Sequence, residues 1–177
     1  MSDTPLSVPL TEQHQTNFFD CGESKLDNWL DTHALNEQRV GKSRTHVWVD
    51  AGGEYVVGYY TLSQTTVRET EDEPGLFRKI RPPKYRGEEA PGILVGKFAL
   101  DNDLQNKGLA LDLLADAYLN AYDAVSLVGG VFLVIEPKQN RDRLRKLYET
   151  FGFQSIEGSN RMFLNFEDFN EGTPIDA

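Results

Sequence analysis

The sequence predicts an α/β fold in which a mixed β-sheet is flanked by helices. Segments with apolar residues at helical spacing alternate with short runs of β-branched and aromatic residues, as helices and strands in succession require. One apolar run, residues 131–135, is continuous, which is typical of a strand buried on both faces. The chain has 177 residues, of which 39% are hydrophobic and 11% aromatic, so it can bury a core and is not a disordered protein.

The N-terminal half should contain one helix and two strands. Ser24 followed by Asp27 is typical of a capping box, and the helix that it opens should end near Gly41. Residues 45–49 are rich in β-branched and aromatic side chains and predict a strand. A glycine turn follows, and a longer strand should run over residues 54–67.

Residues 68–91 should form a long connection, because prolines, glycines and charges interrupt every periodic pattern. A short helix could lie around residues 76–80 within it. The strand over residues 92–100 is mostly apolar, and the next helix should run from Ala110 to the glycine pair at 129–130.

The C-terminal part should add three strands and one helix. The buried strand over residues 131–135 precedes a helix over residues 141–151, which carries its apolar side chains on one side and ends at Gly152. Short strands over residues 153–156 and 162–166 complete the sheet.

Charge is segregated along the chain, which has 18 basic and 28 acidic residues and a formal net charge of −10. Residues 138–146 contain five basic residues against one acid, and residues 78–86 contain five basic residues and no acid. Basic segments on an acidic chain predict anion binding, although two solvated segments that never face each other would give the same pattern. The basic residues of the segment 78–86 are Arg78, Lys79, Arg81, Lys84 and Arg86.

The junction between the strand over residues 92–100 and the following helix reads Gln-Asn-Lys-Gly-Leu-Ala over residues 105–110. The first N–H groups of a helix have no internal acceptors and form the positive end of its dipole. Gly108 lets the main chain approach a phosphate closely, so this turn could bind a pyrophosphate. Alternatively, Gly108 only marks the entry to a helix. No Gly-Lys-Ser/Thr follows, so the turn is not a P-loop.

Other classes of protein are disfavoured by simple features of the sequence. The single cysteine, Cys21, allows neither an internal disulfide nor a cysteine-based metal site, and no metal site is expected. The apolar runs are too short to span a membrane, and the first residues do not form a secretory leader, so we expect a cytoplasmic protein. We expect a tail or first strand over residues 1–17, a single domain over 18–168 and a C-terminal tail over 169–177.

The motif Tyr-x-x-x-Gly-Phe, formed by Tyr148, Gly152 and Phe153, follows the glycine turn at 105–110 in the chain. Together the two motifs resemble the GNAT superfamily of acyl-CoA-dependent N-acetyltransferases. The resemblance implies the GNAT fold, with a central mixed sheet between helices, and acetyl-CoA as the acetyl donor.

The N-terminal half resembles one GNAT branch, the acetyltransferase toxins of type II toxin–antitoxin systems, so that the similarity covers roughly residues 18–166. Such toxins acetylate the α-amino group of aminoacyl-tRNA, block translation and pair with a ribbon–helix–helix antitoxin. The resemblance, with aromatic residues expected to be exposed near Tyr59 and Tyr60, also suggests a homodimer. Two features depart from the family: this chain is acidic, and its phosphate turn ends in Ala110 rather than glycine. The segments that carry the similarity are Phe19-Asp20-Cys21-Gly22, Leu26-Asp27-x-Trp29-Leu30, Gly58-Tyr59-Tyr60-Thr61-Leu62-Ser63 and the strand 92–100 with its preceding basic loop.

The resemblance assigns expected roles to individual residues. Tyr148 would be the general acid for the departing thiolate, unless its ring is only part of the core. Asn140 would hold the cofactor by hydrogen bonds, or cap a helix. The basic residues of the segment 78–86 would contact tRNA phosphates, or only grip coenzyme A. The other residues expected to bind acetyl-CoA are Phe98, Ala99, Leu100, Gln105, Asn106, Lys107, Gly108, Leu109 and Ala110.

The acceptor is constrained by the absence of an obvious base. All three histidines lie before either motif, and an α-amino group, with a pKa near 8, needs less help than a lysine side chain to lose its proton. This modestly favours an α-amine. Two alternatives stay open: a GNAT enzyme that acetylates a small amine, a polyamine or a protein N-terminus, which the acidic body favours, and a non-catalytic module that keeps the fold.

Overall fold

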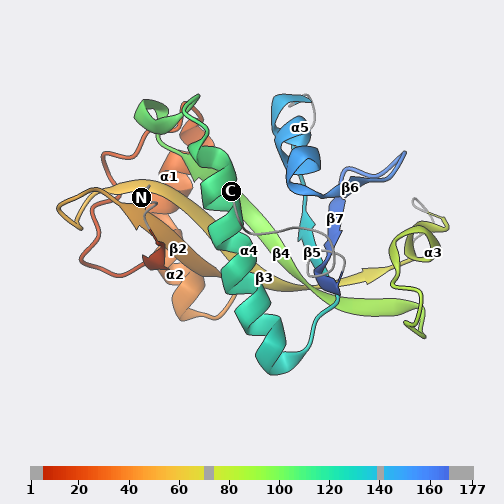
Figure 1. Ribbon diagram of the computed structural model, residues 1–177. Helices are drawn as coiled ribbons and strands as arrows, with labels where there is room; N and C mark the ends of the chain where they lie inside the picture. The colour runs from red at the N-terminus through yellow and green to blue at the C-terminus, as the bar shows by residue number, and fades with distance from the viewer. Residues whose placement is uncertain (1–5, 70–73, 139–141, 168–177) are drawn as a thin grey trace. The chain divides into compact units, whose positions relative to one another are not determined.

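The computed structural model describes residues 6–69, 74–138 and 142–167 (Figure 1). In chain order its elements are β1 (Val8–Pro9), α1 (Ser24–Thr32), α2 (Ala34–Arg39), β2 (Arg44–Val49), β3 (Val56–Arg68), α3 (Leu76–Ile80), β4 (Glu89–Leu100), the 3-10 helix η1 (Asn102–Leu104), α4 (Leu109–Val128), β5 (Phe132–Ile135), α5 (Asp142–Phe151), β6 (Gln154–Ser155) and β7 (Met162–Asn165).

The chain is organised in two compact units, each built from two stretches of sequence. Unit 1 consists of Met1–Ser63 and Val95–Leu119, and unit 2 of Gln64–Leu94 and Asn120–Ala177. Strands β3 and β4 and helix α4 therefore each belong in part to both units. The single domain expected over residues 18–168 stays a prediction.

The strands form one seven-stranded sheet in the order β1-β2-β3-β4-β5-β7-β6. The pairs β1–β2, β2–β3, β5–β7 and β6–β7 are antiparallel. Strands β4 and β5 are neighbours joined through the 20-residue helix α4, which is the crossover that parallel neighbours need. The predicted α/β fold with a mixed sheet is confirmed.

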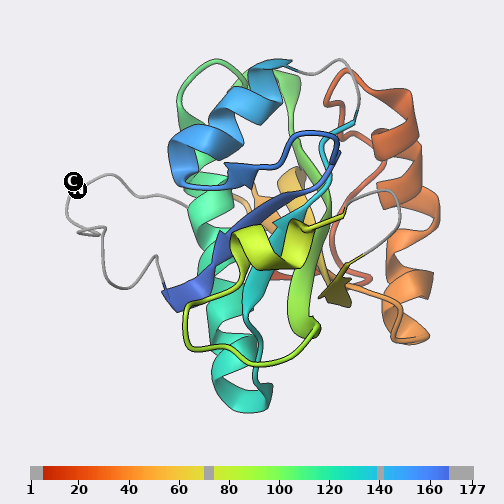
Figure 2. The same ribbon diagram turned by 90° about the vertical axis from the view of Figure 1, so that its right-hand side faces the viewer.

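In unit 1, helices cover both faces of the strands (Figure 2). Successive side chains of β2 alternate between these faces. Val47 belongs to an apolar cluster with Leu30 of α1 and Ala34 of α2. Trp48 points the other way, and its Nε1 donates to the buried Asp116 carboxylate of α4 at 3.0 Å. The N-terminal half of α4 and the pair α1–α2 are thus fixed on opposite sides of the strands.

Tyr59 and Tyr60 are fully buried, so the expectation that aromatic residues are exposed here is wrong. The Tyr59 ring stacks on Trp29 at 6.0 Å between centroids. The Tyr60 ring stacks on His46 at 5.3 Å. Both tyrosines lie on β3, an interior strand with helices on each face, where neither orientation reaches solvent. They therefore give no support to self-association.

In unit 2, the short helix α3 packs an apolar side onto the strands. Its Leu76, Phe77 and Ile80 are buried, and the Phe77 ring meets Phe132 of β5 edge-on at 6.5 Å. All four residues of β5 are buried, as the continuous apolar run predicts. The short helix expected around residues 76–80 is confirmed with those bounds.

The N-terminal helical segment differs from its prediction in two ways. The N-cap of α1 is Glu23, without a side-chain cap, and the Asp27 carboxylate instead accepts the N–H of Cys21 at 2.9 Å. The predicted capping box is therefore wrong. The expected single helix is also broken at His33 into α1 and α2, and it ends at Arg39, just before Gly41.

The other predicted elements exist, with ends that shift by a few residues. The strand expected to start at residue 92 begins at Glu89, and the strand expected over 54–67 runs from Val56 to Arg68. The N-terminal strand is only Val8–Pro9, at the edge of the sheet where a proline is tolerated. Among the residues that the structure describes, no helix has the length and apolar character needed to cross a membrane.

Candidate active site

The turn between β4 and α4 has an open main-chain conformation. Gly108 has a φ angle of 83°, and a Cβ atom added to it would meet nothing within 4 Å. Asn106 has a φ angle of 62°, the one positive φ among the non-glycine residues of the described ranges. These two left-handed residues lead the chain into the first turn of α4, where a helix leaves N–H groups without acceptors of its own. The turn therefore has the main-chain conformation that the predicted anion site needs, and the site itself stays a prediction.

The side chain of Gln105 holds the start of this turn in place. Its Nε2 donates to the carbonyl of Leu100 at 2.8 Å and to the carbonyl of Cys21 at 2.9 Å. Just before it, the Asp101 carboxylate caps η1 by accepting the N–H of Asp103 at 3.0 Å. Both amide hydrogens of the Gln105 side chain are therefore used within the chain. Its main-chain N–H is used as well, because it donates to the carbonyls of Asp101 at 3.2 Å and Asn102 at 3.3 Å. Gln105 thus positions the loop and has no N–H group left for a ligand.

The end of β4 presents its main chain rather than its side chains. Phe98 is half-buried, Ala99 is 4% exposed and Leu100 is 7% exposed. One residue earlier, the N–H of Lys97 donates to the buried hydroxyl of Thr61 at 2.9 Å. Any contact of Ala99 or Leu100 with a substrate must therefore come from main-chain groups.

Tyr148 lies near the end of α5 and is 3% exposed. Its ring packs edge-on against Phe153, with the centroids 6.0 Å apart. Its carbonyl accepts the N–H of Gly152 at 3.1 Å and of Phe153 at 3.0 Å, and Gly152 has a φ angle of 123°. The Tyr-x-x-x-Gly-Phe motif therefore ends the helix and anchors the tyrosine ring, whatever chemistry the phenol performs.

The basic segment 78–86 lies at the surface of unit 2, with all five of its basic side chains exposed. The apolar side of α3 faces the core, which leaves its two basic residues outside. The Arg86 Nη1 donates to the Pro83 carbonyl at 3.4 Å. The remaining four have no ion-pair or hydrogen-bond partner among the described residues: Arg78, Lys79, Arg81 and Lys84. Their charge is available to an external anion.

The second basic segment, over residues 138–146, is partly structural. The Arg145 guanidinium donates to the Ser155 hydroxyl at 3.1 Å and to the Asn160 carbonyl at 3.5 Å, which ties α5 to the β6 strand and the turn after it. Asn140, expected to contact the cofactor, and Arg141 lie outside the described residues.

Cys21 does not provide a nucleophile, and two of the three histidines, His14 and His46, have lowered pKa values. Burial, and then the neighbouring Asp27 carboxylate, raises the pKa of the Cys21 thiol to about 12, so the thiol stays protonated. Burial lowers the pKa of His46, which the Asp116 carboxylate opposes, and burial also lowers the pKa of His14. Both imidazoles belong to unit 1 as packed or local hydrogen-bonding groups.

Sequence reasoning missed two features of the turn. The left-handed conformation of Asn106 could have been anticipated, because asparagine tolerates it better than most residues and stands two positions before Gly108. The positioning role of Gln105 could not have been anticipated, since one of its acceptors is the Cys21 carbonyl, whose place depends on the whole fold.

A search of known sequences identifies a similar protein. The chain is 30% identical over 145 residues to a tRNA-acetylating toxin of Mycobacterium tuberculosis, a match that spans 82% of this chain and 81% of the toxin. No protein-family model matches the chain.

Solved structures of similar fold include those of the toxin AtaT. AtaT complexed with acetyl-methionyl-tRNAfMet matches with a TM-score of 0.78 and 25% identity, over 93% of this chain and 96% of AtaT. AtaTR bound with acetyl-CoA matches with a TM-score of 0.75 and 25% identity, over 93% of this chain and 95% of that one.

Proposed function

The chain belongs to the GNAT family of tRNA-acetylating toxins, and from this premise we propose that it transfers the acetyl group of acetyl-CoA to the α-amino group of aminoacyl-tRNA and so blocks translation. The observation that carries the proposal is the 30% identity with a tRNA-acetylating toxin over most of both chains. The open glycine turn before α4 supports it, because it offers main-chain donors to a diphosphate.

Acetyl-CoA would be bound mainly by main-chain groups. The N–H groups of Gly108, Leu109 and Ala110 at the start of α4 would donate to the diphosphate, with the helix dipole adding to the attraction. Asn106 and Lys107 would contribute the preceding donors, and the exposed Lys107 ammonium would add a charge. The main chain at Phe98, Ala99 and Leu100 would hold the acyl end, because the side chains of Ala99 and Leu100 are buried.

The reaction proceeds by attack of the neutral α-amine on the thioester carbonyl. The N–C bond forms, and the carbonyl becomes a tetrahedral oxyanion that main-chain N–H groups at the end of β4 stabilise. The C–S bond then breaks, the amide carbonyl is restored and coenzyme A leaves as a thiolate. A thiol of this kind has a pKa near 8.5, so a proton donor assists its departure.

In this proposal Tyr148 donates that proton. The resulting phenolate recovers a proton from the ammonium that formed on attack, either directly or through water, so that the net products are the acetylated amine and neutral coenzyme A thiol. No histidine is required, because the α-amino group has a pKa near 8 and is partly neutral before it binds. The rigid packing of the Tyr148 ring against Phe153 supports a fixed position for the donor.

The tRNA would be attracted by Arg78, Lys79, Arg81, Lys84 and Arg86 on the surface of unit 2. Exposed guanidinium and ammonium groups bind phosphates without reading sequence, which suits an enzyme that recognises the aminoacyl end. We also propose a ribbon–helix–helix antitoxin as a partner, a homodimeric state and a cytoplasmic location, as the resemblance to the toxin family implies.

The proposal is tested by adding the purified protein to a translation extract with and without acetyl-CoA. We expect protein synthesis to stop only when both the protein and acetyl-CoA are present. Undiminished synthesis, with thiol release on polyamines or peptide N-termini instead, would contradict it in favour of the small-amine alternative.

A further inference from the structure

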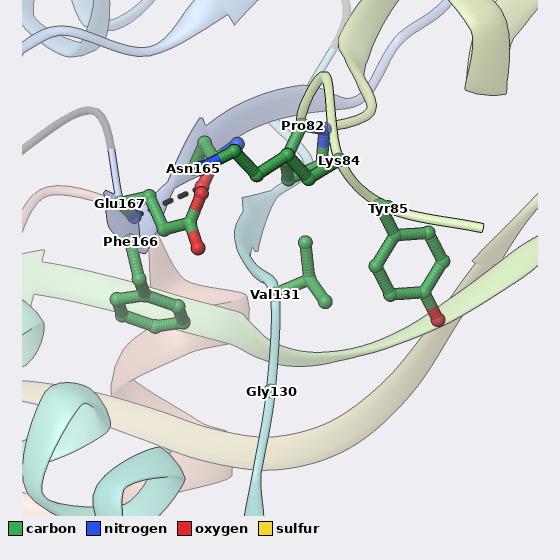
Figure 3. Close-up of a pocket in the computed structure, with 8 residues that line it drawn as sticks. All are labelled: Pro82, Lys84, Tyr85, Gly130, Val131, Asn165, Phe166 and Glu167. Carbon is green, nitrogen blue, oxygen red and sulfur yellow. Dashed lines mark hydrogen bonds between the residues drawn. The ribbon is translucent and has the colours of Figure 1, made fainter.

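A small pocket opens in unit 2, on the surface that also carries the basic segment 78–86 (Figure 3). Its volume is about 230 Å³. Its lining comprises Pro82, Lys84 and Tyr85 from the loop before β4, Gly130 and Val131 before β5, Asn165 at the end of β7, and the following Phe166 and Glu167. No role in acetyl transfer accounts for this group of side chains.

Three polar groups face the pocket with no partner of their own in the described chain. Asn165 is 7% exposed, and its Oδ1 accepts the N–H of Glu167 at 2.9 Å, which fixes the orientation of the amide. Within the described ranges, no residue accepts a hydrogen bond from its Nδ2, and none pairs with the Lys84 ammonium or the Glu167 carboxylate. The pocket therefore offers one cation, one hydrogen-bond donor and one anionic acceptor.

The opposite side of the pocket is apolar and rigid. The Tyr85 ring is held by its hydroxyl, which donates to the Glu89 carbonyl at 2.9 Å, and by edge-on packing against Phe77 at 5.7 Å. Val131 forms part of the floor, and its N–H is bound to the Pro91 carbonyl at 2.9 Å. An aromatic wall and an aliphatic floor beside fixed polar groups suit a flat, partly polar ligand.

The volume of the pocket and the charges around it further limit the class of ligand that it can bind. A volume near 230 Å³ lies below the range of about 300–1,000 Å³ typical of drug-sized ligands, so the pocket fits one ring system and not a whole dinucleotide. Arg81 is exposed and directly precedes Pro82 of the pocket lining, and its charge favours a ligand attached to phosphates. The Glu167 carboxylate disfavours a bare phosphate in the pocket itself and favours a ligand with N–H donors.

We propose that this pocket binds a single unpaired nucleobase that carries an exocyclic amino group, supplied by the tRNA substrate. The Glu167 carboxylate accepts from the amino group, the Asn165 Nδ2 donates to a ring nitrogen or carbonyl, and the Tyr85 ring and Val131 cover the base. Lys84 neutralises an adjacent phosphate. This inference rests on the proposed function, because it takes tRNA as the source of the base.

Removing the charge of Glu167 should change the affinity for tRNA in opposite directions for base recognition and for simple attraction of phosphate. Glu167→Gln removes a negative charge, so a surface that only attracts phosphates should bind tRNA more tightly after the change. A carboxylate that accepts hydrogen bonds from a base should instead weaken binding, by about tenfold for a lost charge-assisted pair. The matched control is Glu88→Gln, an exposed glutamate of the same basic loop that does not line the pocket.

The first measurement is the affinity for uncharged tRNA, by fluorescence anisotropy without acetyl-CoA. We expect Glu167→Gln to lower it about tenfold, and Glu88→Gln to leave it unchanged or raise it slightly. Unchanged or tighter binding of Glu167→Gln would overturn the inference. Because this measurement needs no acetyl transfer, such a result leaves the proposed function standing if acetylation of aminoacyl-tRNA is observed.

The second measurement uses the four nucleoside monophosphates as probes of the wild-type protein by nuclear magnetic resonance. The Asn165 side-chain amide signals should shift with CMP, AMP or GMP and much less with UMP, which has no exocyclic amino group. Equal shifts with UMP, or none with any nucleotide, would overturn the inference. Shifts in a protein that fails to acetylate any aminoacyl-tRNA would support the pocket and refute the proposed function alone.

Discussion

A substitution at Gly108 should affect stability and cofactor binding to different extents. Its positive φ angle disfavours any other residue, yet the space around a Cβ atom is empty. Gly108→Ala should therefore cost about 1 kcal/mol in the free energy of unfolding through backbone strain, with no clash. A methyl group would, however, stand where the diphosphate approaches the main chain. We expect the KM for acetyl-CoA to rise about tenfold, measured by thiol release.

Gly53 provides the control for this prediction. It has a φ angle of 77°, and a Cβ atom there also meets nothing within 4 Å, but it lies in the turn between β2 and β3. Gly53→Ala should lower the free energy of unfolding by a similar amount and leave the KM unchanged. Equal effects of both substitutions on KM would show that the glycine turn before α4 has no special role.

Tyr148→Phe tests the proton donor directly. The phenylalanine ring keeps the packing against Phe153, so the melting temperature should stay near that of the wild type. Loss of a general acid should lower kcat by about 10²- to 10⁴-fold. The control is Tyr55→Phe, an exposed tyrosine of unit 1. A Tyr148→Phe protein with wild-type kcat would remove the phenol from the mechanism.

The Cys21 thiol should resist alkylation in the folded protein. Its pKa is raised to about 12 by burial and the Asp27 carboxylate, while in the unfolded chain it titrates near its ordinary value of 9.0. At pH 8 the thiolate is therefore rare in the native state, and iodoacetamide should label it far more slowly than in urea. Rapid labelling of native protein, followed by mass spectrometry, would contradict the assigned environment.

At the scale of elements, most of the fold could be predicted because the pattern is local. The bounds of α3 and the burial of β5 follow from apolar residues that each element carries itself. The break at His33 could not be predicted from the sequence, because the apolar spacing continues through it to Ala34. At the end of α1 the Thr32 hydroxyl donates to the Asn28 carbonyl at 2.6 Å. It thus competes with main-chain N–H groups for that carbonyl, which the spacing of apolar residues does not reveal.

Like the fold, the candidate site could be predicted only where its residues are contiguous in the sequence. The glycine turn is visible in the sequence because its residues are contiguous. The capping role given to Asp27 failed because its carboxylate instead binds the N–H of Cys21, outside the helix. The pocket near Lys84 and Asn165 could not be predicted, since these residues meet only when β5 pairs with β7 and the loop before β4 folds over them.

The basic segment 78–86 makes a prediction that depends on salt. If Arg78 and Arg81 contact phosphates, each substitution by alanine should weaken tRNA binding for all sequences and reduce the slope of log K against log salt concentration by about 0.7 to 1. Arg39→Ala is the control, because Arg39 is already paired with Glu12. Slopes that do not change in the Arg78 and Arg81 variants, measured by filter binding between low and moderate salt, would place tRNA elsewhere.

At the scale of the whole molecule, the acidic composition and the nucleic acid substrate are compatible because charge is segregated. Unit 1 contains thirteen acidic and six basic residues, whereas the segment 78–86 of unit 2 has five basic residues and no acid. The acidic surface repels RNA in most orientations, so the basic segment should direct its approach. RNA should therefore approach this protein in fewer orientations than it would approach a uniformly basic protein.

The central claim is that the acetyl group ends on the α-amino nitrogen of the amino acid carried by tRNA. The direct measurement is to incubate the protein with acetyl-CoA and charged tRNA, hydrolyse the ester with mild base and identify the released amino acid by mass spectrometry. The account predicts an N-acetylated amino acid, absent when acetyl-CoA is withheld. Only unmodified amino acid, across a full set of charged tRNAs and with the protein folded, would contradict it.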